Sequence, residues 1–345
     1  MQDSWNPTSV PLPGADESST KAWAVSGAYA EESNSLRHRP RNGEWIDDRF
    51  HIVGRPLGKG DLGMVYKVCD REGQWYALKR LSPGLGRNRQ VKDRILADFE
   101  ELHELRPPHL TSYYALFEAD GALYLLMELI DGISLQRLLQ LEQTLPVELA
   151  TWITQGVLQA LEYLHIHQVL HHEVKPENIL LGRDGSVKLT DYGLRWVEYS
   201  TFSQSRNPLQ TPHYMSPEQL RTRKPGEELG PESDLYSLGT VLDEMLCGEN
   251  PYGLTSEMTM RELIRVKQTG TPKPLAETFP ASLRKLIHQL LEHKPHKRLS
   301  DTRVVSQLLM PHSPRPLRAQ DRLGQWVEIH RDPLSDASLE RQKRR

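Results

Sequence analysis

Several short segments of this chain carry residues whose types suit the binding of phosphate. The first contains Gly58, Gly60 and Gly63, between two stretches with the character of strands. Because glycine lacks a side chain, backbone N–H groups in such a turn can approach a phosphate closely. Taken alone, this pattern is more often an ordinary glycine-rich hairpin. The prediction of a nucleotide site therefore also depends on Val65, just after the third glycine, and on Lys79, which follows on a later strand.

A second set of polar residues lies between residues 171 and 191 and suits metal-assisted phosphoryl transfer. It consists of the stretch His171-His172-Glu173-Val174-Lys175-Pro176-Glu177-Asn178 and, 13 residues after its end, Asp191-Tyr192-Gly193. Mg²⁺ prefers hard oxygen ligands, so Asn178 and Asp191 are candidate metal ligands. Lys175 could neutralise negative charge on a phosphoryl group during its transfer.

In this order and at these intervals, the motifs resemble those of the eukaryotic-type (Hanks-type) serine/threonine protein kinase family. The resemblance covers about residues 48 to 311 and includes a later motif, Ser216-Pro217-Glu218. It implies the protein kinase fold, an α+β fold with a small β-rich N-lobe, 48–130, and a larger, mainly helical C-lobe, 131–311. It also implies ATP and Mg²⁺ as cofactors and proteins as substrates.

The resemblance assigns roles to individual residues. Lys79 matches the lysine that holds the α- and β-phosphates, and Met127 matches the residue that guards the inner pocket. The nucleotide site implied comprises Leu57, Gly58, Lys59, Gly60, Gly63, Val65, Ala77, Lys79, Met127, Glu128, Leu129 and Leu180. The catalytic residues implied are Glu173, Lys175, Lys79 and Asp191, and the metal ligands implied are Asn178 and Asp191.

Besides the mild change of Tyr192 for the usual Phe, three positions depart from the family pattern. Glu173 stands where the family has a catalytic Asp, so a carboxylate is kept but its reach changes. A misplacement of about 1 Å can cost about 100-fold in rate, so we expect slow rather than absent turnover. His172 replaces an Arg that grips a phosphorylated activation loop, and we expect loop phosphorylation to matter less. In the family, the lysine that Lys79 matches pairs with a Glu on the following helix, and the matching position here is Asp98. Glu101 is the alternative partner, unless both residues belong to a solvated acidic face of that helix.

Further along the chain, the resemblance implies two structural anchors. Glu218 matches a residue that pairs with Arg298, and Asp234 matches the Asp that anchors the catalytic loop from a buried helix. The segment between Asp191 and Glu218 would be the activation segment. It contains Ser200, Thr201, Ser203, Ser205 and Thr211. Thr211 and Lys175 together resemble kinases directed at serine and threonine rather than tyrosine.

Hydrophobic periodicity predicts the elements that must position these residues. Alternating or continuous apolar runs predict strands at 50–57, 64–69, 74–80, 112–117, 122–129, 179–181 and 187–189. Apolar residues recurring at helical spacing predict helices at 90–105, 146–167, 231–247, 256–267, 280–292 and 301–310. Strands therefore dominate the first part of the chain and helices the second.

Composition limits the classes of protein that fit. The 345 residues carry a net charge of only −3, which argues against nucleic acid as a partner. Cys69 and Cys247 stand far apart without a signal peptide, and no apolar run is long enough to span a membrane; these features favour a cytoplasmic protein. We expect residues 1–47 to form a disordered leader. Residues 312–345 should form a charged flexible tail, which Trp326 could dock against the folded domain. A regulatory partner could bind through the leader or through the tail.

Two other functions remain open from the sequence. The first is a pseudokinase, a nucleotide-binding signalling scaffold, which Glu173, His172 and Asp98 favour. Against it, every phosphate and metal position carries the usual type of residue. The second is a phosphotransferase acting on small molecules, which the segment from Thr211 to Glu218 disfavours because it resembles peptide-directed members of the family.

Overall fold

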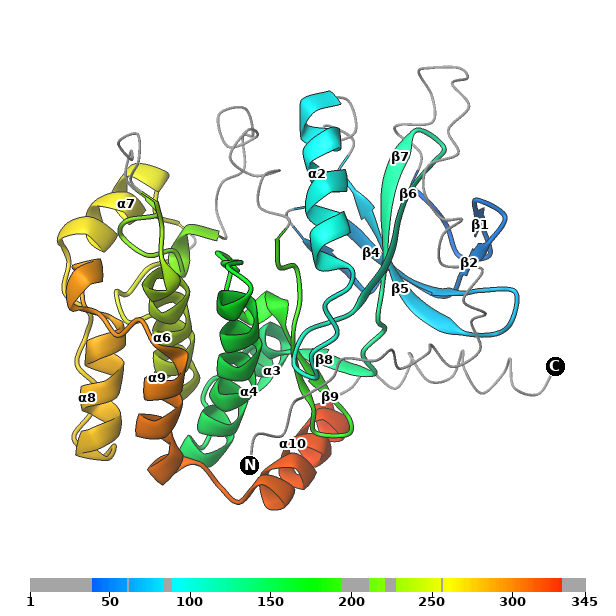
Figure 1. Ribbon diagram of the computed structural model, residues 1–345. Coiled ribbons are helices and arrows are strands. Elements are labelled where there is room, and N and C mark those ends of the chain that lie inside the picture. The colour runs from blue at the N-terminus through cyan, green and yellow to red at the C-terminus, as the bar shows by residue number, and fades with distance from the viewer. Residues whose placement is uncertain are drawn as a thin grey trace, which may run out of the picture.

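The computed structural model describes residues 39–60, 62–82, 89–193, 211–220, 228–255 and 257–330. The polypeptide forms two lobes, a curled β-sheet with one helix against it and a larger lobe built mainly from helices (Figure 1). This arrangement confirms the predicted α+β fold of two lobes.

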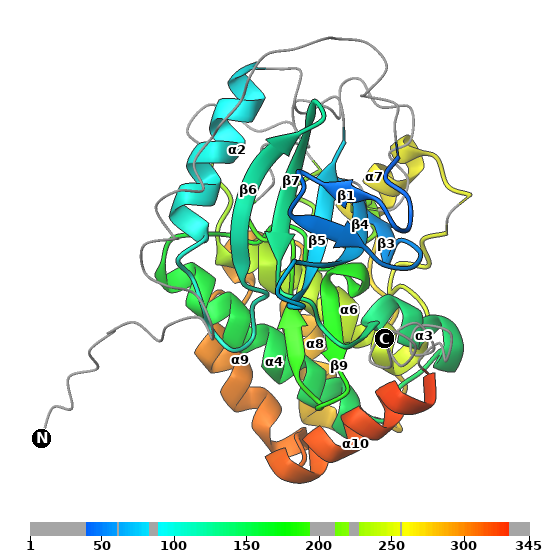
Figure 2. The same ribbon diagram turned by 90° about the vertical axis from the view of Figure 1, so that its right-hand side faces the viewer.

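The N-lobe contains a seven-stranded antiparallel sheet in the order β1-β2-β4-β5-β7-β6, with β3 paired to β4. Its strands are β1 (Trp45–Ile46), β2 (Phe50–Ile52), β3 (Gly58–Gly60), β4 (Gly63–Cys69), β5 (Trp75–Leu81), β6 (Tyr113–Ala119) and β7 (Ala122–Met127). Helix α2 (Arg89–Leu102) lies beside this sheet in both views (Figures 1 and 2).

The two faces of the sheet pack into different apolar clusters. In β5, Leu78 belongs to a cluster with residues of β2 and β6, whereas Ala77 and Leu81 pack into the main core together with α2. Because successive side chains of a strand point to opposite faces, Lys79 lies on the same face as Ala77 and Leu81. The alternation thus turns Lys79 inward, and its side chain is fully buried.

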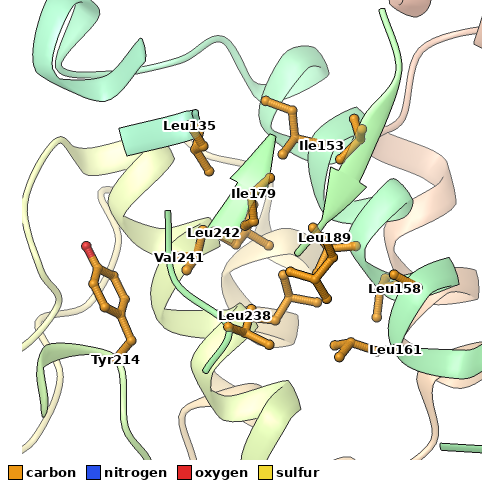
Figure 3. Packing of buried hydrophobic residues seen from close by; sticks show 14 of the residues in the cluster. Leu135, Ile153, Leu158, Leu161, Ile179, Leu189, Tyr214, Leu238, Val241 and Leu242 are labelled. Carbon is orange, nitrogen blue, oxygen red and sulfur yellow. The ribbon is translucent and has the colours of Figure 1, made fainter. Parts of the chain in front are cut away.

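The C-lobe has a helical core with a small sheet on its surface toward the N-lobe. Its helices are α3 (Leu135–Glu142), α4 (Val147–Ile166), α6 (Pro231–Cys247), α7 (Met260–Thr269), α8 (Ala281–Leu290), α9 (Thr302–Leu309) and α10 (Pro316–His330). The sheet has the order β10-β9-β8, from β8 (Gly132–Ser134), β9 (Ile179–Gly182) and β10 (Val187–Leu189). Figure 3 shows Leu158 and Leu161 of α4 and Leu238 and Leu242 of α6 meeting Leu189 in this core.

Helix α6 illustrates how sequence signals set the boundaries of an element. It begins at Pro231, whose fixed φ suits a first helical position. It ends before Gly248, which adopts a left-handed φ of +77° that favours glycine. The helix has the predicted range of residues 231–247, and it carries the buried Asp234.

Two expectations about the ends of the chain need correction. Residues 39–47 were expected within a disordered leader, but β1 (Trp45–Ile46) pairs with β2 and its Ile46 is buried. Residues 1–38 lie outside the described part of the chain. The expected flexible tail, 312–345, contains helix α10 as far as His330; residues 331–345 are not described.

Helix α10 packs against the C-lobe through a narrow apolar stripe. Ala319, Leu323 and Val327 are buried, and the helix lies along α4 and β9 (Figures 1 and 2). Polar contacts add to this packing, because Gln320 Nε2 donates to the Asp184 carbonyl at 2.9 Å. Burial of this stripe stabilises the docked helix, in which four of the 15 residues are charged.

The sequence did not predict the short elements β1, β3, β8 and α3, or the longer helix α10. Helix α3 begins after Ser134, whose side-chain oxygen accepts a hydrogen bond from the backbone N–H of Arg137. None of the helices in the described residues is both long and apolar enough to cross a bilayer.

Candidate active site

The glycine-rich segment forms a hairpin between β3 and β4. Gly58 pairs with Val65, and Gly60 pairs with Gly63. Gly63 has a φ of +152°, and a Cβ there would lie 2.0 Å from the Arg80 carbonyl oxygen, so only glycine fits. A Cβ on Gly58 or Gly60 would meet nothing within 4 Å, which leaves the surface beside these glycines open to a ligand.

The strand register gathers several of the residues predicted to surround adenine. Ala77 lies directly opposite Met127 of β7, and Val65 lies opposite Lys79. The backbone N–H of Leu57 donates to the Val65 carbonyl at 2.8 Å and extends this pairing beyond the glycines. Lys59, between the two exposed glycines, is exposed as well.

The predicted hinge residues follow β7. The backbone N–H of Glu128 donates to the Ser112 carbonyl at 2.9 Å. The main-chain group of Glu128 that could bind the edge of an adenine ring is therefore its carbonyl. The Glu128 carboxylate pairs with Lys188 Nζ at 2.8 Å, and Leu129 packs against the main core. Leu180 of β9 is half-buried between the buried Ile179 and Leu181, as strand alternation requires of a residue facing away from the C-lobe core.

Lys79 makes an ion pair across the two lobes. Its Nζ lies 2.7 Å from Asp191 Oδ2, and the lysine side chain is 1% exposed. Asp98 instead pairs with Arg94 at 2.8 Å, and Glu101 is exposed. In the described residues, neither Asp98 nor Glu101 contacts Lys79. Burial raises the pKa of Asp98, an effect that the neighbouring Arg94 opposes.

The two candidate metal ligands lie on adjacent segments. The backbone N–H of Thr190 donates to the Asn178 carbonyl at 2.9 Å, which places Asp191 next to the loop that ends in Asn178. Asn178 Nδ2 donates to the Glu173 carbonyl at 3.0 Å and so leaves the side-chain oxygen Oδ1 for a cation. Asp191 Oδ2 accepts a hydrogen bond from Lys79, so its other carboxylate oxygen, Oδ1, is also available to a cation. This pair of hard oxygen donors fits Mg²⁺, which commonly keeps several waters or phosphate oxygens as further ligands.

Asp234 of α6 holds the catalytic loop from below. Its carboxylate accepts hydrogen bonds from the backbone N–H groups of His171 at 2.9 Å and His172 at 2.6 Å, and from His165 Nε2 at 2.8 Å. Burial alone would raise the pKa of Asp234, but the hydrogen bond from His165 and the neighbouring histidines lower it to about 2. The predicted anchoring role of Asp234 is therefore confirmed.

Glu173 has a carboxylate oxygen with no partner in the described part of the protein. The side chain is buried, Oε2 lies 3.4 Å from Lys175 Nζ, and the buried Oε1 accepts no hydrogen bond there. A buried acceptor without a donor is costly and needs an explanation. A substrate hydroxyl that donates to Oε1 would supply it.

The end of the predicted activation segment is fixed by a buried ion pair. Arg298 Nη1 lies 2.6 Å from Glu218 Oε1, which confirms the predicted pair. Thr211 begins a short 3₁₀ helix, Thr211–His213. The other hydroxyl residues predicted for this segment, namely Ser200, Thr201, Ser203 and Ser205, lie outside the described residues.

Sequence reasoning missed Gln219 and Tyr113 as residues that support the site. Gln219 Nε2 donates to the His172 carbonyl at 2.9 Å, and its Oε1 accepts from the backbone N–H of Ser216 at 2.8 Å. Gln219 follows a recognised motif directly, so its position was a usable signal. Tyr113 stacks on Tyr192 with ring centroids 4.5 Å apart, a contact between distant segments that no local pattern reveals.

Comparison with known proteins agrees with this geometry. The family described as "Protein kinase domain" matches residues 51–310. A probable serine/threonine-protein kinase of Clostridium perfringens is 29% identical over 265 residues, covering 76% of this chain and 38% of that protein. Aurora kinase C of Mus musculus is 32% identical over 255 residues, 73% of this chain and 88% of the relative. Aurora kinase of Schizosaccharomyces pombe is 30% identical over 261 residues, which cover 74% of this chain and 71% of that protein.

The match therefore spans less than half of the clostridial relative but most of the length of these two Aurora kinases. The family match extends over both lobes and includes each motif on which the site is built. The chain belongs to the protein kinase domain family, as a serine/threonine protein kinase of the Hanks type.

Proposed function

We propose that this kinase transfers the γ-phosphoryl group of ATP to serine or threonine in protein substrates in a reaction that requires Mg²⁺. One observation carries the proposal, namely the ion pair between Lys79 of the N-lobe and Asp191 of the C-lobe. It brings a phosphate-binding cation and a metal-binding carboxylate to one point between the lobes. A protein without nucleotide chemistry has no need to bury this pair there.

In the proposed reaction, each side chain has a task that follows from its chemistry. Bound Mg²⁺ would neutralise the charge that develops on the phosphates. Asp191 and Asn178 would hold that ion, and Lys79 would exchange Asp191 for the α- and β-phosphates. Lys175, which lies 3.4 Å from the Glu173 carboxylate, would stabilise charge on the transferred group. Backbone N–H groups of the glycine hairpin would cover the phosphates.

Glu173 would orient the attacking hydroxyl through its free Oε1. Phosphoryl transfer passes through a loose transition state, so positioning matters more than early proton removal. The carboxylate of Glu173 extends one methylene farther than that of the usual Asp, and a shift of about 1 Å can cost about 100-fold. We therefore propose that turnover is slow but present.

A pseudokinase is the alternative that a specific observation favours. Asp98 is engaged with Arg94 and not with Lys79, so one contact that active kinases require is missing in this conformation. In that case the protein would bind nucleotide and act through a partner surface. Glu173 and His172 are the further departures that favour this alternative.

Transfer of labelled γ-phosphate from Mg-ATP to the protein itself and to a basic generic protein substrate tests the proposal. Lys79→Met and Asp191→Ala serve as controls, because each removes one side of the ion pair between the lobes. We expect label on serine or threonine in the parent and none above background in either variant. Glu173→Asp should raise the rate, by about 10-fold or more if the reach of the carboxylate limits turnover.

Two results would contradict the proposal. Absence of label in both the parent and Glu173→Asp, together with measurable binding of ATP, would favour the pseudokinase. Label that persists in Lys79→Met and Asp191→Ala would mean that a contaminating kinase or a different site is responsible. Transfer to small alcohols in preference to proteins would point to the small-molecule phosphotransferase.

A further inference from the structure

The backbone at Asp191 adopts a left-handed conformation that is uncommon for residues other than glycine. Asp191 has a φ of +66°, in the left-handed region, and Gly193 has a φ of +72°. Left-handed backbone costs free energy at a residue other than glycine, although aspartate tolerates it better than most, so contacts around Asp191 contribute to keeping it there. Since the direction of the Asp191 carboxylate depends on this backbone, the groups that impose it also aim the carboxylate.

Two buried tyrosine hydroxyls bond to the main chain next to Asp191. Tyr113 Oη donates to the Tyr192 carbonyl at 3.2 Å, and Tyr192 Oη donates to the Thr111 carbonyl at 2.9 Å. The two rings stack with centroids 4.5 Å apart and an interplanar angle of 6°. Both side chains are fully buried. The pair thus forms a reciprocal clasp, in which each ring packs on the other and each hydroxyl ties down the partner's segment.

The residue on the other side of Asp191 is tied to the same segment. Thr111 Oγ1 donates to Thr190 Oγ1 at 3.0 Å, and the backbone N–H of Thr111 donates to the Leu189 carbonyl at 3.1 Å. His171 Nε2 contacts the Thr190 carbonyl at 2.9 Å. Asp191 therefore lies between two anchored residues, while its own side chain remains free to meet Lys79 and a cation.

We propose that Tyr113 and Tyr192 are positioning residues for Asp191, whose hydroxyls hold the backbone around it in the conformation that presents its carboxylate to a metal ion. The inference rests on the proposed function, in which Asp191 holds the Mg²⁺ of bound ATP. In a purely structural role, the same hydroxyls would satisfy buried carbonyl groups and affect only the stability of the fold.

The variants Tyr113→Phe and Tyr192→Phe separate these roles, because each keeps the stacked ring and removes one donor. The matched control is Tyr114→Phe, the same substitution one residue along β6. Tyr114 alternates to the other face of the strand, where it packs on Tyr76. All variants are made in the full chain, and Tyr192→Phe serves as the second test if Tyr113→Phe folds poorly.

The first measurement is calorimetric binding of a non-hydrolysable ATP analogue over a range of Mg²⁺ concentrations. We expect each clasp variant to raise, by about 2- to 10-fold, the Mg²⁺ concentration at which the enhancement of analogue binding is half-maximal. This factor corresponds to the free energy that one hydrogen bond contributes. Affinity for the analogue without Mg²⁺ should stay within about 2-fold of that of the parent. Tyr114→Phe should match the parent in its Mg²⁺ requirement and in its affinity for the analogue without Mg²⁺. An unchanged Mg²⁺ requirement in both clasp variants, whatever their melting temperatures, would overturn the proposal.

Hydrogen exchange in the nucleotide-free protein provides a readout that does not depend on ATP. We expect the amides of residues 190–193 to exchange about 2- to 10-fold faster in either clasp variant and at the parental rate in Tyr114→Phe. Equal exchange in all proteins would overturn the clasp. If the parent protein showed no Mg²⁺-dependent binding of the analogue, that result would instead contradict the proposed function. The exchange rates alone would then test whether the two hydroxyls hold the backbone around Asp191.

Discussion

Two of the buried ion pairs in the described residues, Arg298–Glu218 and Lys79–Asp191, differ in how completely their charges are satisfied. Arg298 and Glu218 are almost fully buried, and the guanidinium also donates to the carbonyl groups of Glu292 at 2.9 Å and Glu232 at 2.8 Å. Glu218 accepts a further hydrogen bond from Ser233 at 2.7 Å. Lys79 and Asp191 share a single contact, and Asp191 is 15% exposed.

The difference separates a structural pair from one that can exchange partners. A charge with many fixed hydrogen bonds is held in one arrangement, and removing its partner strands it in a medium of low dielectric constant. A pair with one contact, open on one side, can part when a ligand offers a better partner. The pair between the lobes therefore suits a binding site, whereas the pair at the end of the activation segment suits a fixed support.

The largest expected effect is on stability and tests the structural pair. Glu218→Ala should lower the free energy of unfolding by about 3–5 kcal/mol, because Arg298 would keep a buried charge without its counter-ion. Urea denaturation followed by circular dichroism measures this change. A matched double variant, Glu218→Met with Arg298→Leu, removes both charges and should be destabilised less than Glu218→Ala. A loss below about 1 kcal/mol for Glu218→Ala would remove the distinction between the pairs.

The second prediction tests the pair between the lobes. Lys79→Met should lower kcat/KM for phosphoryl transfer by about 10² to 10³, the usual cost of removing one oriented group that stabilises charge. Its free energy of unfolding should change by less than about 1 kcal/mol, since Asp191 can reach water. Assays of transfer and urea denaturation on the same preparation check both parts. A Lys79→Met protein that is as unstable as Glu218→Ala would show that this pair too is mainly structural.

The same contrast explains what the sequence could predict. Glu218, Arg298 and Asp234 belong to motifs whose resemblance to the family identified their partners correctly, because their contacts are part of the fold itself. The partner of Lys79 could not be derived in this way. Whether Asp98 reaches Lys79 depends on where α2 lies against the sheet, and no local pattern in the sequence encodes that position.

The helices likewise differ in how well the sequence alone predicts them. Long periodic segments such as α4 and α6 were predicted with nearly correct bounds, because their apolar stripes are wide. Helix α10 buries only Ala319, Leu323 and Val327, four residues apart, within a charged segment that was therefore expected to be loose. The stripe was visible in the sequence, but its binding surface on α4 and β9 exists only after the C-lobe has folded.

The third prediction concerns acid stability and sharpens the account of fixed supports. The pKa of Asp234 is lowered from 3.8 to about 2 in the folded protein. A carboxylate with a lowered pKa stabilises the fold above its unfolded pKa, and this contribution is lost as the pH falls from about 4 to about 2. Asp234→Asn should therefore cost about 2 kcal/mol at pH 7 and much less near pH 2. Thermal unfolding at several pH values measures it, and an equal cost at both ends would contradict the linkage.

The smallest expected effect comes from a third buried charge near the structural pair. Lys267 is fully buried in α7 and forms no ion pair with a carboxylate in the described residues; its Nζ lies 4.8 Å from the ring centres of both Tyr236 and Tyr252. Burial and the nearby Arg298 lower the pKa of Lys267 to about 7, although Glu218 and Glu244 act in the opposite direction. The folded protein thus binds this proton more weakly than the unfolded chain does.

Stability should consequently rise between about pH 7 and pH 10, where the folded protein has lost the proton and the unfolded chain retains it. Lys267→Met keeps the apolar stem and removes the charge, so it should increase the free energy of unfolding by about 1–2 kcal/mol at pH 6 and flatten that rise. Lys273→Met is the control, because Lys273 is exposed beside Glu249 and should change stability by less than about 0.5 kcal/mol. Destabilisation by Lys267→Met at pH 6 would instead mean that the two aromatic rings satisfy the ammonium, and that a buried charge here needs no carboxylate.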